Sequence, residues 1–230
     1  MSNELMFVMD VVLFLFATVA MYKLFGLSGL YAFTVFGVIL ANIQVSKNIM
    51  LFGLETTAGN VLYASTFLAT DIIEEHYGHK QALKAVRIGI VTTVLWVIGT
   101  QLTLHLTPSA SDFVQGPMEG LFGIVPRICL GSLIAYVVSQ FTDTFLYRFW
   151  WSVTKTSENP NRMKWLRNNG STLISQFLDT IIFVTISFYG VYDSKVFFSI
   201  LWTTYLFKAI VALCDTPFLY LAGKIKPMED

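Results

Sequence analysis

Residues 5–25 read LMFVMDVVLFLFATVAMYKLF, an apolar run whose only charged residues are Asp10 and Lys23. A helix of about 20 such residues spans the hydrocarbon core of a membrane. Six similar runs follow along the chain: Ser28–Val45, Ala58–Ile73, Ile88–Leu106, Ile128–Trp151, Thr172–Val191 and Val196–Ala222. Because membrane strands are shorter and alternate in polarity, the sequence predicts an all-α, polytopic transmembrane helix bundle of about seven spans. We expect residues 1–230 to form a single domain.

The composition of the whole chain supports a membrane protein. Hydrophobic residues make up 55% of the 230 residues and charged residues only 13%, about half the usual charged share of a soluble domain. A soluble core of this size could not hide so much apolar surface. The composition therefore excludes a soluble enzyme, a disordered tail and a nucleic-acid-binding module with a basic face. Both cysteines fall within apolar runs and are interpreted as small buried side chains.

The distribution of Lys and Arg predicts the orientation, because short cytoplasmic loops carry an excess of these residues. Eleven of them lie after the first, third and fifth runs or near the C-terminus: Lys23, Lys80, Lys84, Arg87, Arg148, Lys155, Arg162, Lys164, Arg167, Lys224 and Lys226. Three lie on the opposite side: Lys47, Arg127 and Lys195. The sequence therefore predicts an N-terminus outside the cell membrane and a C-terminus in the cytoplasm.

Two connections lack the pattern of a membrane helix. Residues 48–57 are interpreted as a loop, with a re-entrant turn as the alternative, since non-helical backbone at membrane depth must be surrounded by protein or by a water-filled cavity. Residues 108–120 contain two prolines and two glycines, which is typical of an exposed outer connection.

Charged and amide side chains at membrane depth are costly and usually face a cavity or a partner. The segment SQFTDT at 139–144 recurs as SQFLDT at 175–180. Gln and Asp three residues apart share one helix face, so two neighbouring helices could direct these groups toward one cavity. The repeat supplies Gln140, Asp143, Gln176 and Asp179. The alternative is hydrogen bonding between helices, which explains Ser and Thr better than it explains two carboxylates.

Further polar residues in or beside the runs complete the candidate substrate site. They are Asn42, Lys47, Asp71, Glu75 and Lys208. Lys208 could serve as the counter-ion of the acids in the repeat. For Asp71 and Glu75 the alternative is a solvated helix end, although acids there oppose the helix dipole. We expect neither a metal nor a cofactor.

The chain also contains ANIQVSK at 41–47 and ATDIIEEHYG at 69–78. The most specific pattern is formed by Asp71, Glu75, Tyr77 and Gly78. Together with the paired segments, these motifs resemble the queuosine precursor transporter family, also called the vitamin uptake transporter family. The resemblance implies a carrier in the bacterial inner membrane for a 7-deazaguanine base, such as queuine or the 7-cyano or 7-aminomethyl forms, destined for tRNA modification. Many members of the family are assigned six spans. We therefore expect the first run here to be an extra N-terminal helix, and we place its start in the periplasm.

A guanine-type base suits the candidate residues chemically. A carboxylate can accept the N–H donors on one edge of the base, and an amide can donate to its O6. Aromatic side chains could stack on the ring; the candidates are Phe141, Phe177, Phe183 and Tyr205.

Two other functions remain open from the residues. One is a substrate-binding membrane subunit of an ATP-driven vitamin importer, and the other is an intramembrane enzyme. An enzyme would need a nucleophile–base pair or metal ligands, and the motifs for these are weak, so we do not expect an enzyme. The expected partners are the small-molecule substrate and membrane lipid, without nucleic acid. A homo-oligomer, the coupling ion and the choice of precursor are left open.

Overall fold

The computed structural model describes residues 2–123, 125–154, 163–190 and 193–227. Its elements are α1 (Asn3–Gln44), β1 (Asn48–Leu51), β2 (Leu54–Thr57), α2 (Asn60–Tyr77), α3 (His79–Leu104), α4 (Gln115–Phe122), α5 (Val125–Thr154), α6 (Lys164–Phe188) and α7 (Ser194–Ala222). Within the described chain, α1, α3, α5, α6 and α7 are long and apolar enough to cross a membrane. The predicted all-α membrane bundle is confirmed, whereas the number of spans stays a prediction.

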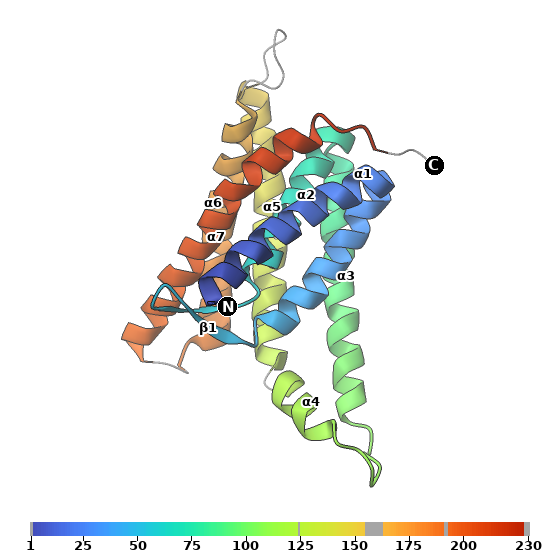
Figure 1. The fold of residues 1–230 in the computed structure, drawn as a ribbon, viewed down its shortest axis with the longest axis vertical. Coiled ribbons are helices and arrows are strands. Elements are labelled where there is room, and N and C mark those ends of the chain that lie inside the picture. The colour runs from blue at the N-terminus through green and yellow to red at the C-terminus, as the bar shows by residue number, and fades with distance from the viewer. Residues whose placement is uncertain (1, 124, 155–162, 191–192, 228–230) are drawn as a thin grey trace.

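The first two apolar runs lie within α1, which is bent sharply at Gly26. Gly26 has φ 54° and ψ −133°, a conformation that favours glycine because a Cβ would be strained there. Figure 1 shows the dark-blue segment running away from the N-terminus and the lighter-blue segment returning beside it. The boundary that the sequence predicts between residues 25 and 28 is therefore confirmed.

The segment 48–57 is a β-hairpin, so its interpretation as an irregular loop is wrong. β1 and β2 pair antiparallel, with Leu51 opposite Leu54. Between them Phe52 (φ 51°) and Gly53 (φ 78°) both have positive φ, as a two-residue type I′ turn requires. The start of α1 holds the hairpin, because Asn3 Nδ2 donates to Met50 O at 2.9 Å. The Phe52 ring also stacks on Phe207, near the middle of α7.

Helix α2 corresponds to the third run and lies inside the bundle (Figure 1). Most of its side chains from Asn60 to Glu74 are buried. A helix that contacts protein on all sides does not meet lipid, so it can carry polar residues without the usual cost. This explains how α2 can carry Asp71 and Glu74 at buried positions.

Several helices start or end away from the predicted boundaries. α3 and α6 begin about two turns earlier than their apolar runs. One face of these added turns packs on protein, with Ala82 and Ala85 of α3 and Asn168 of α6 buried. As a consequence Arg167, which the sequence assigns to a cytoplasmic loop, is a fully buried residue of α6. A short helix, α4, occupies part of the expected outer connection 108–120.

The basic connections gather at one end of the bundle. A Cβ on Gly26 would lie 3.2 Å from Tyr77 Oη and 3.6 Å from Pro227, which places the first and third connections beside the C-terminal segment. At the start of α6, the backbone N–H of Trp165 donates to Tyr220 Oη, near the end of α7, at 3.2 Å. Lys155 and Arg162, which entered the orientation count, lie outside the described residues. The side of the membrane that this end faces stays a prediction.

Gly89 allows α3 to approach α5 closely. A Cβ at Gly89 would lie 2.2 Å from Tyr136 Oη and 2.8 Å from Tyr136 Cζ, whereas one at Gly99 of the same helix would have nothing within 4 Å. Tyr136 is almost fully buried, so its ring has little room to move. Small residues of this kind permit close helix packing in membranes.

We therefore expect Gly89→Ala to lower the free energy of unfolding by about 1–3 kcal/mol through overpacking. The matched change Gly99→Ala should leave it unchanged or raise it by up to about 1 kcal/mol, because alanine favours helix. Thermal unfolding of both purified variants in the same detergent measures the difference. Equal midpoints would contradict the close contact.

Candidate functional site

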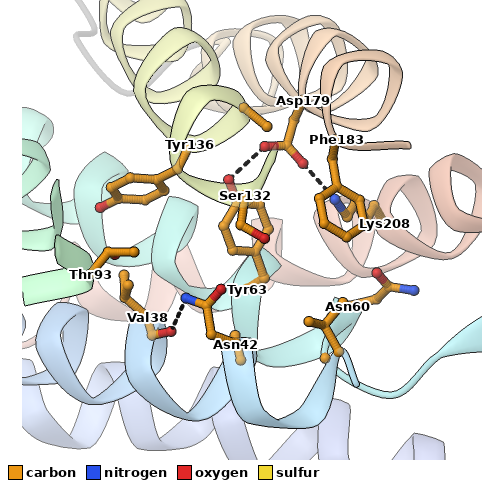
Figure 2. Close-up of a pocket in the computed structure, with 14 residues that line it drawn as sticks. Val38, Asn42, Asn60, Tyr63, Thr93, Ser132, Tyr136, Asp179, Phe183 and Lys208 are labelled. Carbon is orange, nitrogen blue, oxygen red and sulfur yellow. Dashed lines mark hydrogen bonds and ion pairs between the residues drawn. The ribbon is translucent and has the colours of Figure 1, made fainter. Parts of the chain in front are cut away.

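A small pocket lies where six helices converge, and we call it the six-helix pocket. It has a volume of about 40 Å³, which is room for about three water molecules. Figure 2 shows polar side chains from every one of these helices: Asn42 of α1, Asn60 and Tyr63 of α2, Thr93 of α3, Ser132 and Tyr136 of α5, Asp179 of α6 and Lys208 of α7.

Asp179 is the electrostatic centre of the six-helix pocket. One carboxylate oxygen accepts from Tyr63 Oη at 2.6 Å and from Ser139 Oγ at 3.2 Å. The other oxygen accepts from Lys208 Nζ at 2.5 Å (Figure 2). Both charged residues are at least 95% buried, and a buried ion pair persists only when further hydrogen bonds satisfy its atoms. In this closed pocket Asp179 therefore has its acceptor sites filled by protein donors.

The remaining walls offer amide, hydroxyl and aromatic groups. Asn42 donates its Nδ2 to Val38 O at 2.8 Å, which leaves the amide oxygen for other donors. The buried hydroxyl of Tyr136 has no hydrogen-bond partner among the described residues. Phe183 also lines the pocket, and Lys208 Nζ lies 4.8 Å from the centroid of the Tyr63 ring. These rings and unpaired polar atoms could receive a flat heteroaromatic ligand once the pocket widens.

A second polar group, which we call the acidic cluster, lies on the cytoplasmic side predicted for the bundle. It consists of Asp71 of α2, Asp143 of α5 and Asp215 of α7, and all three are at least 99% buried. Ser175 Oγ donates to Asp143 at 2.9 Å and Asn168 Nδ2 to Asp215 at 2.5 Å. The acidic cluster does not line the six-helix pocket.

Two buried amides lie between the six-helix pocket and the acidic cluster. Thr70 Oγ1 donates to Gln140 Oε1 at 3.3 Å. The Nε2 of Gln140 and both amide atoms of Gln176 have no partner in the part of the chain that the structure describes. Buried polar atoms are rarely left unpaired in native proteins, and unresolved water or a ligand is a usual explanation.

A third group closes this end of the polar interior. Arg167 Nη2 lies 3.3 Å from Glu75 Oε1, and Tyr147 Oη donates to the other Glu75 oxygen at 2.8 Å. The Arg167 guanidinium also lies 4.6 Å from the centroid of the Trp151 ring. The charge of Glu75 is therefore balanced by Arg167 within the fold, and Glu75 does not lie at a solvated helix end.

The structure separates the predicted site residues into these groups. Asn42, Asp179 and Lys208 line the six-helix pocket; Asp71 and Asp143 belong to the acidic cluster; Gln140 and Gln176 lie between them. Glu75 pairs with Arg167, and the Lys47 side chain is exposed outside all three groups. The expectation that the repeat directs both of its carboxylates into one cavity is wrong.

The antiparallel arrangement of α5 and α6 explains this separation. The serine of each repeat copy pairs with the aspartate of the other copy, Ser139 with Asp179 and Ser175 with Asp143. The two aspartates are therefore offset by about four residues, or about 6 Å along the helices. The two copies of the repeat therefore make two Ser–Asp contacts between α5 and α6, and these contacts place Asp179 in the six-helix pocket and Asp143 in the acidic cluster.

Sequence reasoning missed several residues of the pocket, among them Asn60, Tyr63 and Tyr136. Asn60 and Tyr63 lie three residues apart, and Thr70 and Asp71 follow Tyr63 by seven and eight residues, so all four share one face of α2. This polar stripe was the available signal. Tyr136 carries no such signal, because an isolated tyrosine in an apolar run is common at membrane depth.

Comparisons with known proteins agree on one family. A family model described as "Putative vitamin uptake transporter" matches residues 57–222. A protein of Bacillus subtilis (strain 168) named "Probable queuosine precursor transporter" is 38% identical over 230 residues, covering 100% of this chain and 99% of the relative. An Escherichia coli (strain K12) protein named "Queuosine precursor transporter" is 25% identical over 184 residues and 75% of each chain. No solved structure matches the chain.

Proposed function

Because the chain belongs to the vitamin uptake transporter family, we propose that it takes up a queuosine precursor across the bacterial inner membrane. The name of the full-length relative supports a queuosine precursor as the substrate. More specifically, we propose that this precursor is a 7-deazaguanine base used for tRNA modification. The observation that carries the proposal is the six-helix pocket, whose centre is a buried carboxylate with aromatic and amide neighbours.

In the proposed complex, Asp179 accepts the ring N–H and the 2-amino group of the base. A carboxylate accepts two parallel N–H donors well, and a guanine-type edge presents such a pair. Asn42 and Asn60 supply amide groups for the remaining edge atoms, while Phe183, Tyr63 or Tyr136 stacks on the ring. Among the described residues no arginine lines the pocket, which disfavours a phosphate-bearing substrate because phosphate usually needs a bidentate arginine or a helix N-terminus.

Binding requires the pocket to change from the closed form. A space for about three waters is too small for a bicyclic base, and the oxygens of Asp179 are engaged by Tyr63, Ser139 and Lys208. We propose that the base enters when the helices separate and that its N–H donors replace the protein donors on Asp179. The Asp179–Lys208 pair then stabilises the empty carrier.

The proposal predicts how analogues compete for uptake. An analogue without the 2-amino group should inhibit uptake of a labelled 7-deazaguanine base about 10²- to 10⁴-fold more weakly, because it leaves a buried carboxylate oxygen without a donor. A nucleoside monophosphate should not inhibit at comparable concentration. The measurement is competition in liposomes that contain only the purified chain.

This assay also separates the carrier from the alternative function. Uptake by the chain alone supports a carrier, whereas binding without transport would support a subunit that needs an ATP-hydrolysing partner. Equal inhibition by the monophosphate would overturn recognition of the base edge. Liposomes prepared without protein provide the background rate.

A further inference from the structure

We propose that Asp71 and Asp143, with Asp215 beside them, form a proton-binding site that couples uptake of the base to the proton gradient. This inference rests on the proposed function, because it assigns the energy source of the same transport cycle. It concerns the acidic cluster, which takes no part in lining the six-helix pocket.

The first argument is the contact between two carboxyl groups. Asp71 and Asp143 lie against the same turn of α6, because Thr172 Oγ1 donates to Asp71 at 3.4 Å and Ser175 Oγ donates to Asp143 at 2.9 Å. Asp143 Oδ2 is buried and has no hydrogen-bond partner among the described residues. Two carboxylates cannot hydrogen-bond to each other unless one of them carries a proton. A proton on Asp71 would therefore supply a donor for the unpaired oxygen of Asp143.

The second argument is the balance of charge around the acidic cluster. The titratable groups that lie next to the three aspartates are Glu74 of α2, Tyr147 of α5 and Cys214 of α7. Beyond them, near Glu74 or Glu75, lie His79 of α3, Arg148 of α5 and Arg167 of α6. Arg148 acts on Glu74, and Arg167 pairs with Glu75. No ion pair from Lys or Arg to the three aspartates is found in the described chain. Three neighbouring buried carboxylates without a cation cannot all stay ionised, so at least one must bind a proton.

The donors around the acidic cluster favour a proton over a metal ion. Asn168 turns its Nδ2 toward Asp215, and the hydroxyls of Ser175 and Thr172 donate to Asp143 and Asp71. A cation would instead be approached by the amide and hydroxyl oxygens. The described residues also contain no group of His, Cys, Asp and Glu arranged to hold a metal.

The reciprocal contacts of α5 and α6 connect proton binding to the six-helix pocket. Ser175 donates to Asp143 in the acidic cluster, and Ser139 of the partner repeat donates to Asp179 in the pocket. Protonation of Asp143 weakens its acceptance from Ser175, and a shift of α6 against α5 would also move Asp179. The unpaired amides of Gln140 and Gln176 lie between the two sites and can hold water that carries protons along this path.

The experiment uses the purified full chain in liposomes with a labelled 7-deazaguanine base. Base exchange, with unlabelled base inside and no gradient, reports the proposed function. Accumulation against a concentration difference, with the outside one pH unit more acidic, reports coupling. If one proton moves with each base, the wild type should accumulate up to about tenfold, and a protonophore should remove this accumulation.

Asp143→Asn should reduce the accumulation ratio to about one, and any exchange that remains should not respond to the gradient. Asp71→Asn should behave in the same way and carries the test if Asp143→Asn is not recovered folded. The matched control is Glu119→Gln, an acid-to-amide change in the exposed helix α4, which should accumulate as the wild type does.

The outcomes are distinguishable. A wild type that exchanges the base but accumulates none with the pH gradient overturns the proton site, as does accumulation driven by sodium alone. Full accumulation by both aspartate variants also overturns it. A wild type that shows no exchange of any 7-deazaguanine base overturns the proposed function and the coupling with it.

Discussion

Lys208→Met is expected to lower uptake of the labelled base by about 30- to 4,000-fold at equal abundance in the membrane. The change removes the ammonium group 2.5 Å from Asp179 and leaves that carboxylate buried with only the hydroxyls of Tyr63 and Ser139. Loss of one partner of a buried charged pair costs about 2–5 kcal/mol. This cost falls on the closed, empty carrier through which each transport cycle must return, and it corresponds to the stated range at about 1.4 kcal/mol per factor of ten. Initial rates of uptake, normalised to the amount of inserted protein, measure the effect.

Two further variants interpret the result. Lys195→Met makes the same chemical change at an exposed position in the first turn of α7 and should retain the wild-type rate. The double variant Asp179→Asn with Lys208→Met removes both charges, so it should recover thermal stability without recovering uptake. A wild-type rate in Lys208→Met would show that the ion pair has no part in transport.

Arg167→Met is expected to lower the free energy of unfolding by about 3–5 kcal/mol. The Arg167 side chain is fully buried, and its guanidinium lies 3.3 Å from Glu75 and against the Trp151 ring. Its removal takes a positively charged partner from the buried carboxylate of Glu75, which also accepts from Tyr147 Oη. The measurement is thermal unfolding in detergent together with the folded fraction recovered from membranes.

The control for Arg167→Met is Arg87→Met, at an exposed position in α3, where we expect a change within about 0.5 kcal/mol. Adding Glu75→Gln to Arg167→Met should restore part of the lost stability, because the buried carboxylate that has lost Arg167 is then made neutral as well. Unfolding midpoints of Arg167→Met and Arg87→Met that coincide would contradict a structural role for the buried pair.

Much of the architecture could be predicted from the sequence, because membrane insertion depends on local composition. Long apolar runs determine helices wherever lipid is the solvent, since every backbone hydrogen bond must then be made within the segment. The bend at Gly26 follows equally locally from a glycine between two runs. The hairpin at 48–57 was missed because its turn places Phe52 at positive φ, a conformation that a phenylalanine does not signal. The family resemblance also rested on short local motifs and is confirmed by the relatives.

The composition of the site, in contrast, was decided by the tertiary structure. The sequence determined which polar residues enter the membrane, but not which of them meet, because partners in a bundle come from helices far apart in the chain. The antiparallel packing of α5 and α6 offsets the two repeat aspartates along the bundle. Asp179 then meets Lys208 of α7 in the six-helix pocket, and Asp143 joins Asp71 of α2 in the acidic cluster. Arg167 became a core residue only because α6 extends past its apolar run to reach Glu75. Local patterns specify helices and faces, whereas the register between antiparallel helices specifies contacts, and that register is set by the packing of the whole bundle.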